Sequence, residues 1–187
     1  MITREQAWKL LTEKMQNQNL RRHSLSVEIV MRALAKHFAA NAEKWAIVGL
    51  LHDGDYEFTK EDPANHAKLM ANWVRQLGET DQELLEGIES HGWFHQGRQA
   101  QTQMQWALFC CDELTGLIVA CALVLPSKHL ADLSVQSVLK KFPQKSFAGG
   151  VKREDIAMCE EKLDIKLEEF VKIALEAMQS IASEIGL

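Results

Sequence analysis

The chain has 187 residues, of which 47% are hydrophobic and 25% are charged, and its formal net charge is −5 at pH 7. This length fits one ordinary domain with a substantial core, and the composition excludes a disordered protein. The acidic balance argues against a protein that coats a nucleic-acid polymer, because phosphate binding requires a clustered basic surface.

The N-terminus and the longest apolar run indicate where the protein acts. The first residues, MITREQAWKLL, lack the basic start and apolar centre of a secretion signal. The longest apolar run, LIVACALVL at 117–125, is much shorter than the roughly 20 residues that span a bilayer. We therefore expect a cytoplasmic protein without a membrane partner. The sequence leaves a homodimer open.

Apolar residues recur at helical spacing along most of the chain, and no convincing strand pattern competes, although AIVGLL alone would fit a short buried strand. The start and stop signals are Thr3-x-x-Gln6, Asp62-Pro63, Thr80-x-x-Glu83 and the break at Pro126. We expect an all-α, single-domain bundle of about eight or nine helices. They cover about residues 3–17, 20–40, 42–53, 62–77, 80–90, 102–125, 127–141, 153–163 and 166–185.

The four cysteines, at positions 110, 111, 121 and 159, include no Cys-x-x-Cys pair. This spacing suits neither a zinc knuckle nor a disulfide scaffold. We expect buried thiols in a reducing compartment.

Polar residues fall among apolar ones on five of the expected helices. These residues are His23, His52, Asp53, His66, His91 and Asp112. One buried histidine is usually a hydrogen-bonded core residue, but a buried carboxylate without a partner is costly or becomes neutral. A divalent cation would pair the carboxylates and use the imidazoles as neutral donors. Because one tetrahedral ion does not take so many ligands, we expect two ions that share a bridging carboxylate.

The other histidines fit this centre less well. His37 also lies on the apolar side of its expected helix, but it is about 21 Å along the helix from His23. His129 lies in a polar stretch, and we expect it at the surface. His95 follows His91 in a GWFHQGR turn, without the glutamate of a zinc-protease motif. We expect His95 beside a ligand or facing the substrate.

The order His23 … His52-Asp53 … His66 … His91 … Asp112 resembles the HD superfamily of metal-dependent phosphohydrolases, in the branch with the pattern H…HD…H…H…D. The flanking segments LRRHSLSVE, WAIVGLLHDGDYE, CCDELTGLIVA and KKFPQKSFAGGVKRE are similar to a small bacterial group of HD hydrolases. The resemblance covers nearly the whole chain. It implies a single HD domain over 1–187, with a metal-binding core at about 20–125 and helices from 127–187 packed on it.

Carried over residue by residue, the resemblance implies that His23, His52 and Asp112 hold one ion. His66 and His91 would hold the second, and Asp53 would bridge the two. The resemblance allows Mn, Mg, Fe, Ni, Co or Zn. Neighbouring helix residues point about 100° apart, so His52 and Asp53 reach different ions only near a helix end. We expect Gly54 to turn the chain there.

The sequence departs from the commonest HD pattern at HDGDYE, where Asp55 and Glu57 follow the His-Asp pair. Many relatives have a lysine or glycine soon after that pair, so the usual lysine that contacts phosphate is not evident. We expect Asp53 and Asp55 to act in catalysis. For Asp55 two interpretations stay open: an acceptor that orients a ligand histidine, or an ordinary residue at a helix end.

These residues imply a metal-dependent phosphohydrolase for a small phosphorylated compound, such as a nucleotide or a related ester, in which a metal-activated water attacks phosphorus. The candidate substrate contacts are His95, Arg98, Lys141 and Lys152. The lysines also fit a plain solvated face. Two alternatives stay open: an HD-type mixed-valent di-iron oxygenase, and a non-catalytic metal-binding signalling module.

Overall fold

The computed structural model describes all residues, 1–187, and consists of helices, turns and connecting segments without any strand. The expectation of an all-α fold is confirmed. The α-helices are α1 (Arg4–Lys14), α2 (Gln18–His37), α3 (Ala42–Leu51), α4 (Tyr56–Thr59), α5 (Lys68–Gln76), α6 (Gln82–Ser90), α7 (Gln103–Leu123), α8 (Val135–Lys141), α9 (Arg153–Leu163), α10 (Leu167–Gln179) and α11 (Ala182–Ile185). Three short 3-10 helices, η1 (Pro63–Asn65), η2 (Trp93–Gln96) and η3 (Leu130–Asp132), lie between them.

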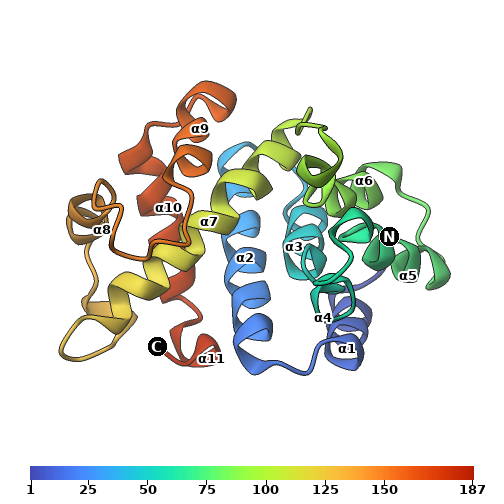
Figure 1. Cartoon of the computed structure of the whole chain (residues 1–187), viewed down its shortest axis with the longest axis horizontal. Helices are drawn as coiled ribbons and strands as arrows, with labels where there is room; N and C mark the ends of the chain where they lie inside the picture. Colours follow the sequence, from blue (N-terminus) through green and yellow to red (C-terminus); the bar gives the residue numbers. More distant parts are fainter.

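The long helices α2 and α7 form the centre of the molecule (Figure 1). α3 packs along α2, and α7 packs against both α2 and α9. Figure 1 shows α1, α3, α5 and α6 on one side of α2, and α8, α9 and α10 on the other. The segments before and after α7 therefore meet across these two central helices.

α7 is long and apolar enough, by length and composition alone, to cross a membrane. In the fold, however, it runs through the middle of the bundle and buries most of its residues against neighbouring helices (Figure 1). A capping box begins it: the Thr102 hydroxyl accepts from the Gln105 backbone N–H, and the Gln105 side chain accepts from Thr102 in return. This is the packing of a helix that forms part of the core of a helical bundle.

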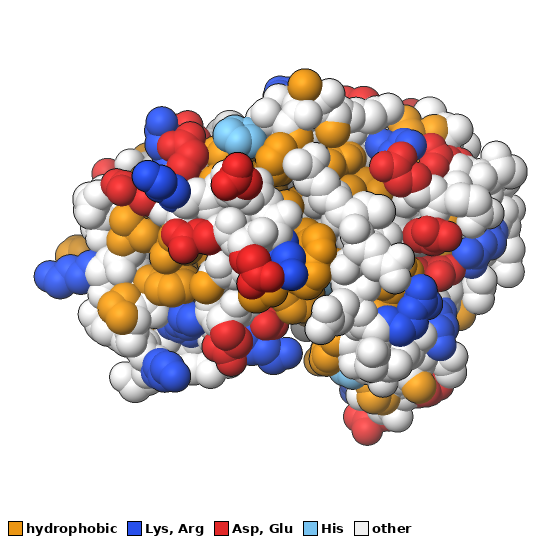
Figure 2. Space-filling model, turned by 90° about the horizontal axis from the view of Figure 1, so that it is seen from above, with side chains coloured by type: hydrophobic (Ala, Val, Ile, Leu, Met, Phe, Trp, Pro, Cys, Tyr) orange, Lys and Arg blue, Asp and Glu red, His pale blue; other side chains and the backbone are white.

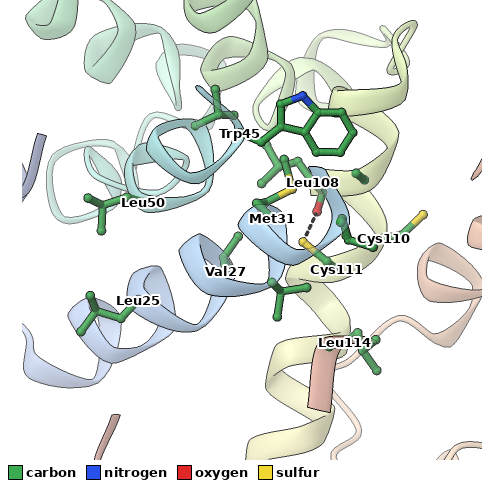
Figure 3. Close-up of a cluster of buried hydrophobic side chains, with 14 of the residues drawn as sticks. Leu25, Val27, Met31, Trp45, Leu50, Leu108, Cys110, Cys111 and Leu114 are labelled. Carbon is green, nitrogen blue, oxygen red and sulfur yellow. Dashed lines mark hydrogen bonds between the residues drawn. The ribbon is translucent and has the colours of Figure 1, made fainter. Parts of the chain in front are cut away.

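One hydrophobic core holds α2, α3 and α7 together (Figure 3). In it, Met31 of α2 and Trp45 of α3 pack with Leu108 of α7. All four cysteines are buried and unpaired, as expected, and the Cys111 thiol donates to the Leu108 carbonyl at 3.6 Å. Burial raises the pKa of Cys111 well above its ordinary value, so this thiol is an inert part of the core.

The expected helix at 62–77 is wrong in its first turn. Pro63–Asn65 forms the 3-10 helix η1, Asp62 makes no capping bond, and α5 begins only at Lys68. Between them, Ala67 adopts the left-handed conformation with φ 65°. An α-helix cannot continue through that conformation, so the chain turns there.

Three other helix boundaries also differ. Asp81, rather than Thr80, caps α6, because its carboxylate accepts from the Leu84 N–H. The expected helix at 127–141 shortens to α8, which Ser134 caps. The expected helix at 166–185 divides into α10 and α11, because Ile181 leaves the helical conformation at φ −122°. The capping box at Thr3 and Gln6 is confirmed.

A buried carboxylate, that of Glu79, ties the N-terminal segment to α6. Its side chain accepts from the backbone N–H of Ile2 at 2.6 Å and from those of Thr80 and Asp81 at 2.9 and 3.0 Å. Burial would raise the pKa of Glu79, but these backbone donors hold it below its ordinary value. No pattern in the sequence indicates this contact across 77 residues.

Acidic and basic side chains are interspersed on the face seen in Figure 2, with hydrophobic atoms between them. No extended basic patch is visible on this face. Such a mixed surface differs from the basic stripe that follows a nucleic-acid backbone.

Candidate metal centre

The six candidate ligands come from separate parts of the chain and gather beside one cleft of about 650 Å³, which four of them line. His23 and Asp112 project from the middles of α2 and α7. His52 and His91 are the C-terminal cap residues of α3 and α6. Asp53 lies in the turn after His52, and His66 lies in the turn before α5. The cleft lining includes Asp53, His66, His91 and Asp112.

One group of ligands gathers around Asp112. Its Oδ1 atom lies 2.8 Å from Nε2 of His23 and 3.5 Å from Nε2 of His52. The two imidazole rings meet edge to face with centroids 5.2 Å apart. Their ligand atoms all lie within 4.8 Å of one another, so the three residues form a group that could hold a cation.

A second group gathers around Asp53. Its Oδ1 atom lies 3.0 Å from Nε2 of His66 and 3.1 Å from Nε2 of His91. Its Oδ2 atom lies 3.9 Å from Nε2 of His52. His52, Asp53 and His91 form the second group whose ligand atoms lie within 4.8 Å of one another. His52 thus belongs to both groups, and the Asp53 carboxylate faces both.

His52 has one ring nitrogen with a partner and one without. Its Nδ1 atom donates to the Gly49 carbonyl at 2.7 Å, which leaves Nε2 to face the carboxylates of Asp53 and Asp112. The side chain is fully buried, and Nε2 has no hydrogen-bond partner. A buried ring nitrogen without a partner is costly, and metal-ligating histidines commonly donate their second nitrogen to a backbone carbonyl in this way.

Asp55 is fully buried behind His66 and does not line the cleft. Its Oδ1 atom lies 2.8 Å from Nδ1 of His66 and accepts from the Ala67 N–H at 3.1 Å. Its Oδ2 atom accepts from the Met70 N–H at 2.9 Å. Because it cannot touch a substrate, the expectation of a catalytic Asp55 is wrong. The geometry favours the other interpretation, an acceptor that orients a ligand histidine.

The backbone around His66 is also specific. The histidine lies in a turn rather than on a helix face, contrary to the expectation, and the left-handed Ala67 follows it. A Cβ atom on Gly92 would lie only 2.2 Å from the His66 carbonyl oxygen, so only glycine fits there. Gly54, by contrast, has no positive φ, and the expectation that it frees the turn after Asp53 is wrong.

The charges of the centre balance one another within a low-dielectric site. Burial would raise the pKa of Asp53, but the neighbouring histidines, His52 first, hold it well below its ordinary value. Burial acts on Asp112 in the same way, and His23 and His52 lower its pKa. For His66, burial would lower the pKa, but Asp53 and Asp55 raise it to about 9. Protonated histidines therefore compensate the carboxylates, and a divalent cation would displace those protons on binding.

Of the four candidate substrate contacts, His95 and Lys152 line the cleft. Arg98 lies elsewhere, with its guanidinium 4.0 Å from the Trp93 ring centroid, because Gly97 turns the chain at φ 69°. Lys141 packs on Phe147 and does not line the cleft either. Arg98 and Lys141 do not line this cleft, and Arg98 lines an adjoining cavity instead, so their expected substrate contacts stay predictions.

Of the remaining histidines, only His95 lies near the candidate ligands. His129 is exposed, as expected, and His37 is also exposed rather than on an apolar face. The His95 ring is 6.2 Å from that of His66. Burial and the neighbouring His66 lower the pKa of His95, so its imidazole is neutral near pH 7.

The cleft has further lining residues that the sequence analysis does not single out as contacts. They are Tyr56, Thr59, Lys60, Pro63, Phe94, Phe109, Glu113 and Asp155. Of these, only Glu113 directly neighbours a residue of the motif, Asp112, and the motif cannot say which neighbour faces the cleft. Asp155 belongs to α9, and only the packing of α9 on α7 brings it to the ligands.

Comparisons with known proteins agree with this geometry. The family model of the HD domain matches residues 20–122, which include all six candidate ligands. Neither the curated proteins nor the solved structures contain a match to the chain. The model covers more than half of the sequence, and the fold is all-α, as the resemblance implies. The chain therefore belongs to the HD domain family, whose members are mostly metal-dependent phosphohydrolases.

Proposed function

We propose that the protein is a cytoplasmic phosphohydrolase with a dinuclear metal site. It would hydrolyse the phosphate ester bond of a small compound, such as a nucleotide or a related ester. The observation that carries the proposal is the Nε2 atom of His52. It is buried, has no hydrogen-bond partner and points to the shared region of two groups of metal-binding side chains.

The residues fit a divalent ion in number and spacing. Two ligands that each lie about 2.1 Å from an ion are separated by about 3 Å. The nitrogen–oxygen distances around Asp53 and Asp112, from 2.8 to 3.5 Å, are of this size. His23, His52 and Asp112 would hold one ion, and His66 and His91 the other.

The division of the Asp53 oxygens between two sets of histidines supports a bridging role for this residue. One oxygen faces His66 and His91, and the other faces His52. A carboxylate in this position has one oxygen for each ion, which is the arrangement that two neighbouring cations need.

The charge of the cleft also favours bound cations. Carboxylates outnumber lysines in its lining, which contains Asp53, Asp112, Glu113 and Asp155 against Lys60 and Lys152. Even with protonated histidines that compensate the carboxylates, such a surface offers a phosphate ester no net attraction. Divalent ions at the six ligands would make the local charge positive and phosphate binding favourable.

When bound, the ions would supply a Lewis acid for the phosphate oxygens and a water acidic enough to attack phosphorus near neutral pH. The chain itself would bind and orient the substrate. The Lys60 and Lys152 ammonium groups would pair with phosphate oxygens at the mouth of the cleft. The neutral imidazole of His95 would form a hydrogen bond with the substrate beside them. Asp55 would hold the orientation of His66 from behind.

The test combines elemental analysis of protein purified without added metal with a broad screen of phosphate esters. We expect two equivalents of a divalent metal and hydrolysis of at least one ester, both of which a chelator removes. Asp53→Ala should abolish hydrolysis and the loading of at least one ion, because no other carboxylate can replace the bridge. Asp132→Ala, which removes an exposed carboxylate far along the chain, is the matched control.

Two outcomes would contradict the proposal. Retention of two metal equivalents by Asp53→Ala would refute the bridging role. Metal-loaded protein that melts at a lower temperature after chelation, but hydrolyses no ester, would indicate a structural or signalling centre instead. Hydrolysis with Mn or Mg under anaerobic conditions would exclude the oxygenase alternative, whereas oxygen consumption by iron-loaded protein would favour it.

A further inference from the structure

A second cavity, of about 310 Å³, adjoins the metal cleft. The two cavities share Phe94, Phe109 and Asp155 as walls. The ammonium group of Lys152 lies 4.9 Å from the Phe94 ring centroid, and Lys152 also lines the cleft. A phosphate held near Lys152 would therefore place the rest of its molecule beside this second cavity.

The first turn of α9 forms the wall between the cavities, and it is firmly held. The backbone N–H of Lys152 donates to Glu113 at 3.1 Å, next to Asp112 of the metal centre. The Arg153 guanidinium is buried and donates to four backbone carbonyls of the preceding loop. These acceptors belong to Phe142, Phe147, Ala148 and Val151. A wall anchored in this way can define the shape of a ligand.

The lining of the second cavity combines flat apolar faces with carboxylates. Trp106 and Phe109 meet edge to face, with ring centroids 5.5 Å apart and planes at 84°. Glu154 and Asp155 line the same cavity. Its one arginine, Arg98, already lies over the Trp93 ring. Aromatic walls favour a flat ring, and the half-buried Asp155 and the exposed Glu154 both offer carboxylate acceptors to N–H donors of that ring.

We propose that this second cavity, the ring pocket, binds the leaving group of the substrate, and that this group is a flat heteroaromatic ring with N–H donors. The ring would pack against Phe94 and Trp106 and donate to the carboxylates of Glu154 and Asp155. The assignment as a leaving-group site rests on the proposed hydrolase function. Binding of the ring itself does not, since it requires neither metal nor phosphate.

The experiment uses 2-aminobenzimidazole, a flat ring with N–H donors and no phosphate, and quinoline, a flat ring without such donors. Binding to the full-length protein is measured by chemical-shift changes of the Trp106 indole. We expect saturable binding of 2-aminobenzimidazole in the millimolar range, about tenfold tighter than that of quinoline. Glu154→Gln combined with Asp155→Asn should remove this difference, because both carboxylate acceptors lose their charge.

A filling variant locates the site. Ala100 lines the ring pocket from a loop, so Ala100→Leu should weaken the binding of 2-aminobenzimidazole about tenfold or more by occupying the pocket. Ala157→Leu adds the same volume to the exposed face of α9 and should bind like the unmodified protein. No saturable binding, equal binding by Ala100→Leu, or equal affinity for quinoline would overturn the proposal. Binding without any ester hydrolysis would support the pocket and count against the hydrolase function alone.

Discussion

Asp55→Asn tests how the centre positions its ligands, because Asp55 touches His66 but not the cleft. An asparagine has one oxygen where the carboxylate has two. If that oxygen keeps the bonds from His66 and Ala67, the new NH₂ group faces the Met70 N–H, donor against donor. The variant thus replaces one charge-assisted bond by a neutral one and leaves a buried N–H without an acceptor. We expect the free energy of unfolding to fall by about 3 kcal/mol.

The same change should weaken metal binding. Removing the partner that orients a ligand histidine costs about 10–100-fold in metal affinity. The pKa of His66 supplies a second readout in the metal-free protein. Asp53 and Asp55 together raise this pKa from 6.5 to about 9, against the effect of burial. The pair therefore stabilises the fold fully below pH 6.5, and this contribution is lost as the pH rises through about 9. In Asp55→Asn the folded pKa should lie lower, so the loss should still begin near pH 6.5 but be complete at a lower pH.

The assays are urea unfolding of the metal-free protein, calorimetric metal titration, and an NMR titration of the His66 ring. Asp62→Asn is the matched control, because it removes one charge from an exposed position in the same segment. Unfolding and metal affinity that both match the unmodified protein would refute the positioning role. A loss of stability with unchanged metal affinity and an unchanged His66 pKa would show that Asp55 supports only the fold.

Three other substitutions test contacts that hold the fold and the site. Glu79→Ala should lower the free energy of unfolding by about 2 kcal/mol in urea titrations near neutral pH. Because its folded pKa lies below 4.5, this difference from the unmodified protein should disappear as the pH falls through that lower value. Gly92→Ala should destabilise the protein by about 2 kcal/mol and weaken metal binding, since its Cβ would collide with the His66 carbonyl. Arg153→Ala should speed amide hydrogen exchange across 142–151 while α2 stays protected; an unchanged exchange rate there would contradict its role as the anchor of this loop.

The gathering of the six candidate ligands could be predicted from the sequence because their chemistry conflicts with their surroundings. Asp112 lies in an apolar helix, and His52-Asp53 ends another, so a shared explanation was needed. His66 shows the limit of that reasoning. It was expected on a helix face, yet it lies in a turn set by the left-handed Ala67. Its part in the site was still predicted, because that prediction depended on residue type and order.

The substrate contacts were harder to predict because they depend on long-range packing. Arg98 is near His91 in the sequence, but Gly97 turns the chain and Arg98 packs on Trp93 instead. Lys141 and Lys152 belong to the same basic stretch, and only Lys152 lines the cleft. The difference arises from the buried Arg153, whose bonds to backbone carbonyls fold the intervening loop. No spacing rule in the sequence expresses such a contact.

The cleft therefore has two parts, the segment with the candidate ligands and the start of α9, and different contacts hold each part in place. The segment that matches the HD domain, 20–122, contains all six candidate ligands, and the α2, α3 and α7 core fixes several of them. Lys152 and Asp155 lie outside that segment, at the start of α9, and reach the cleft only through contacts such as Glu113 with the Lys152 N–H. A substitution at the start of α9 would shift the Lys152 ammonium group and the ring pocket together, while the six candidate ligands would stay in place. If the proposed function holds, substrate choice should be able to vary at α9 while the candidate ligands keep their places, because the two parts meet beside Asp112 but are stabilised largely by separate contacts.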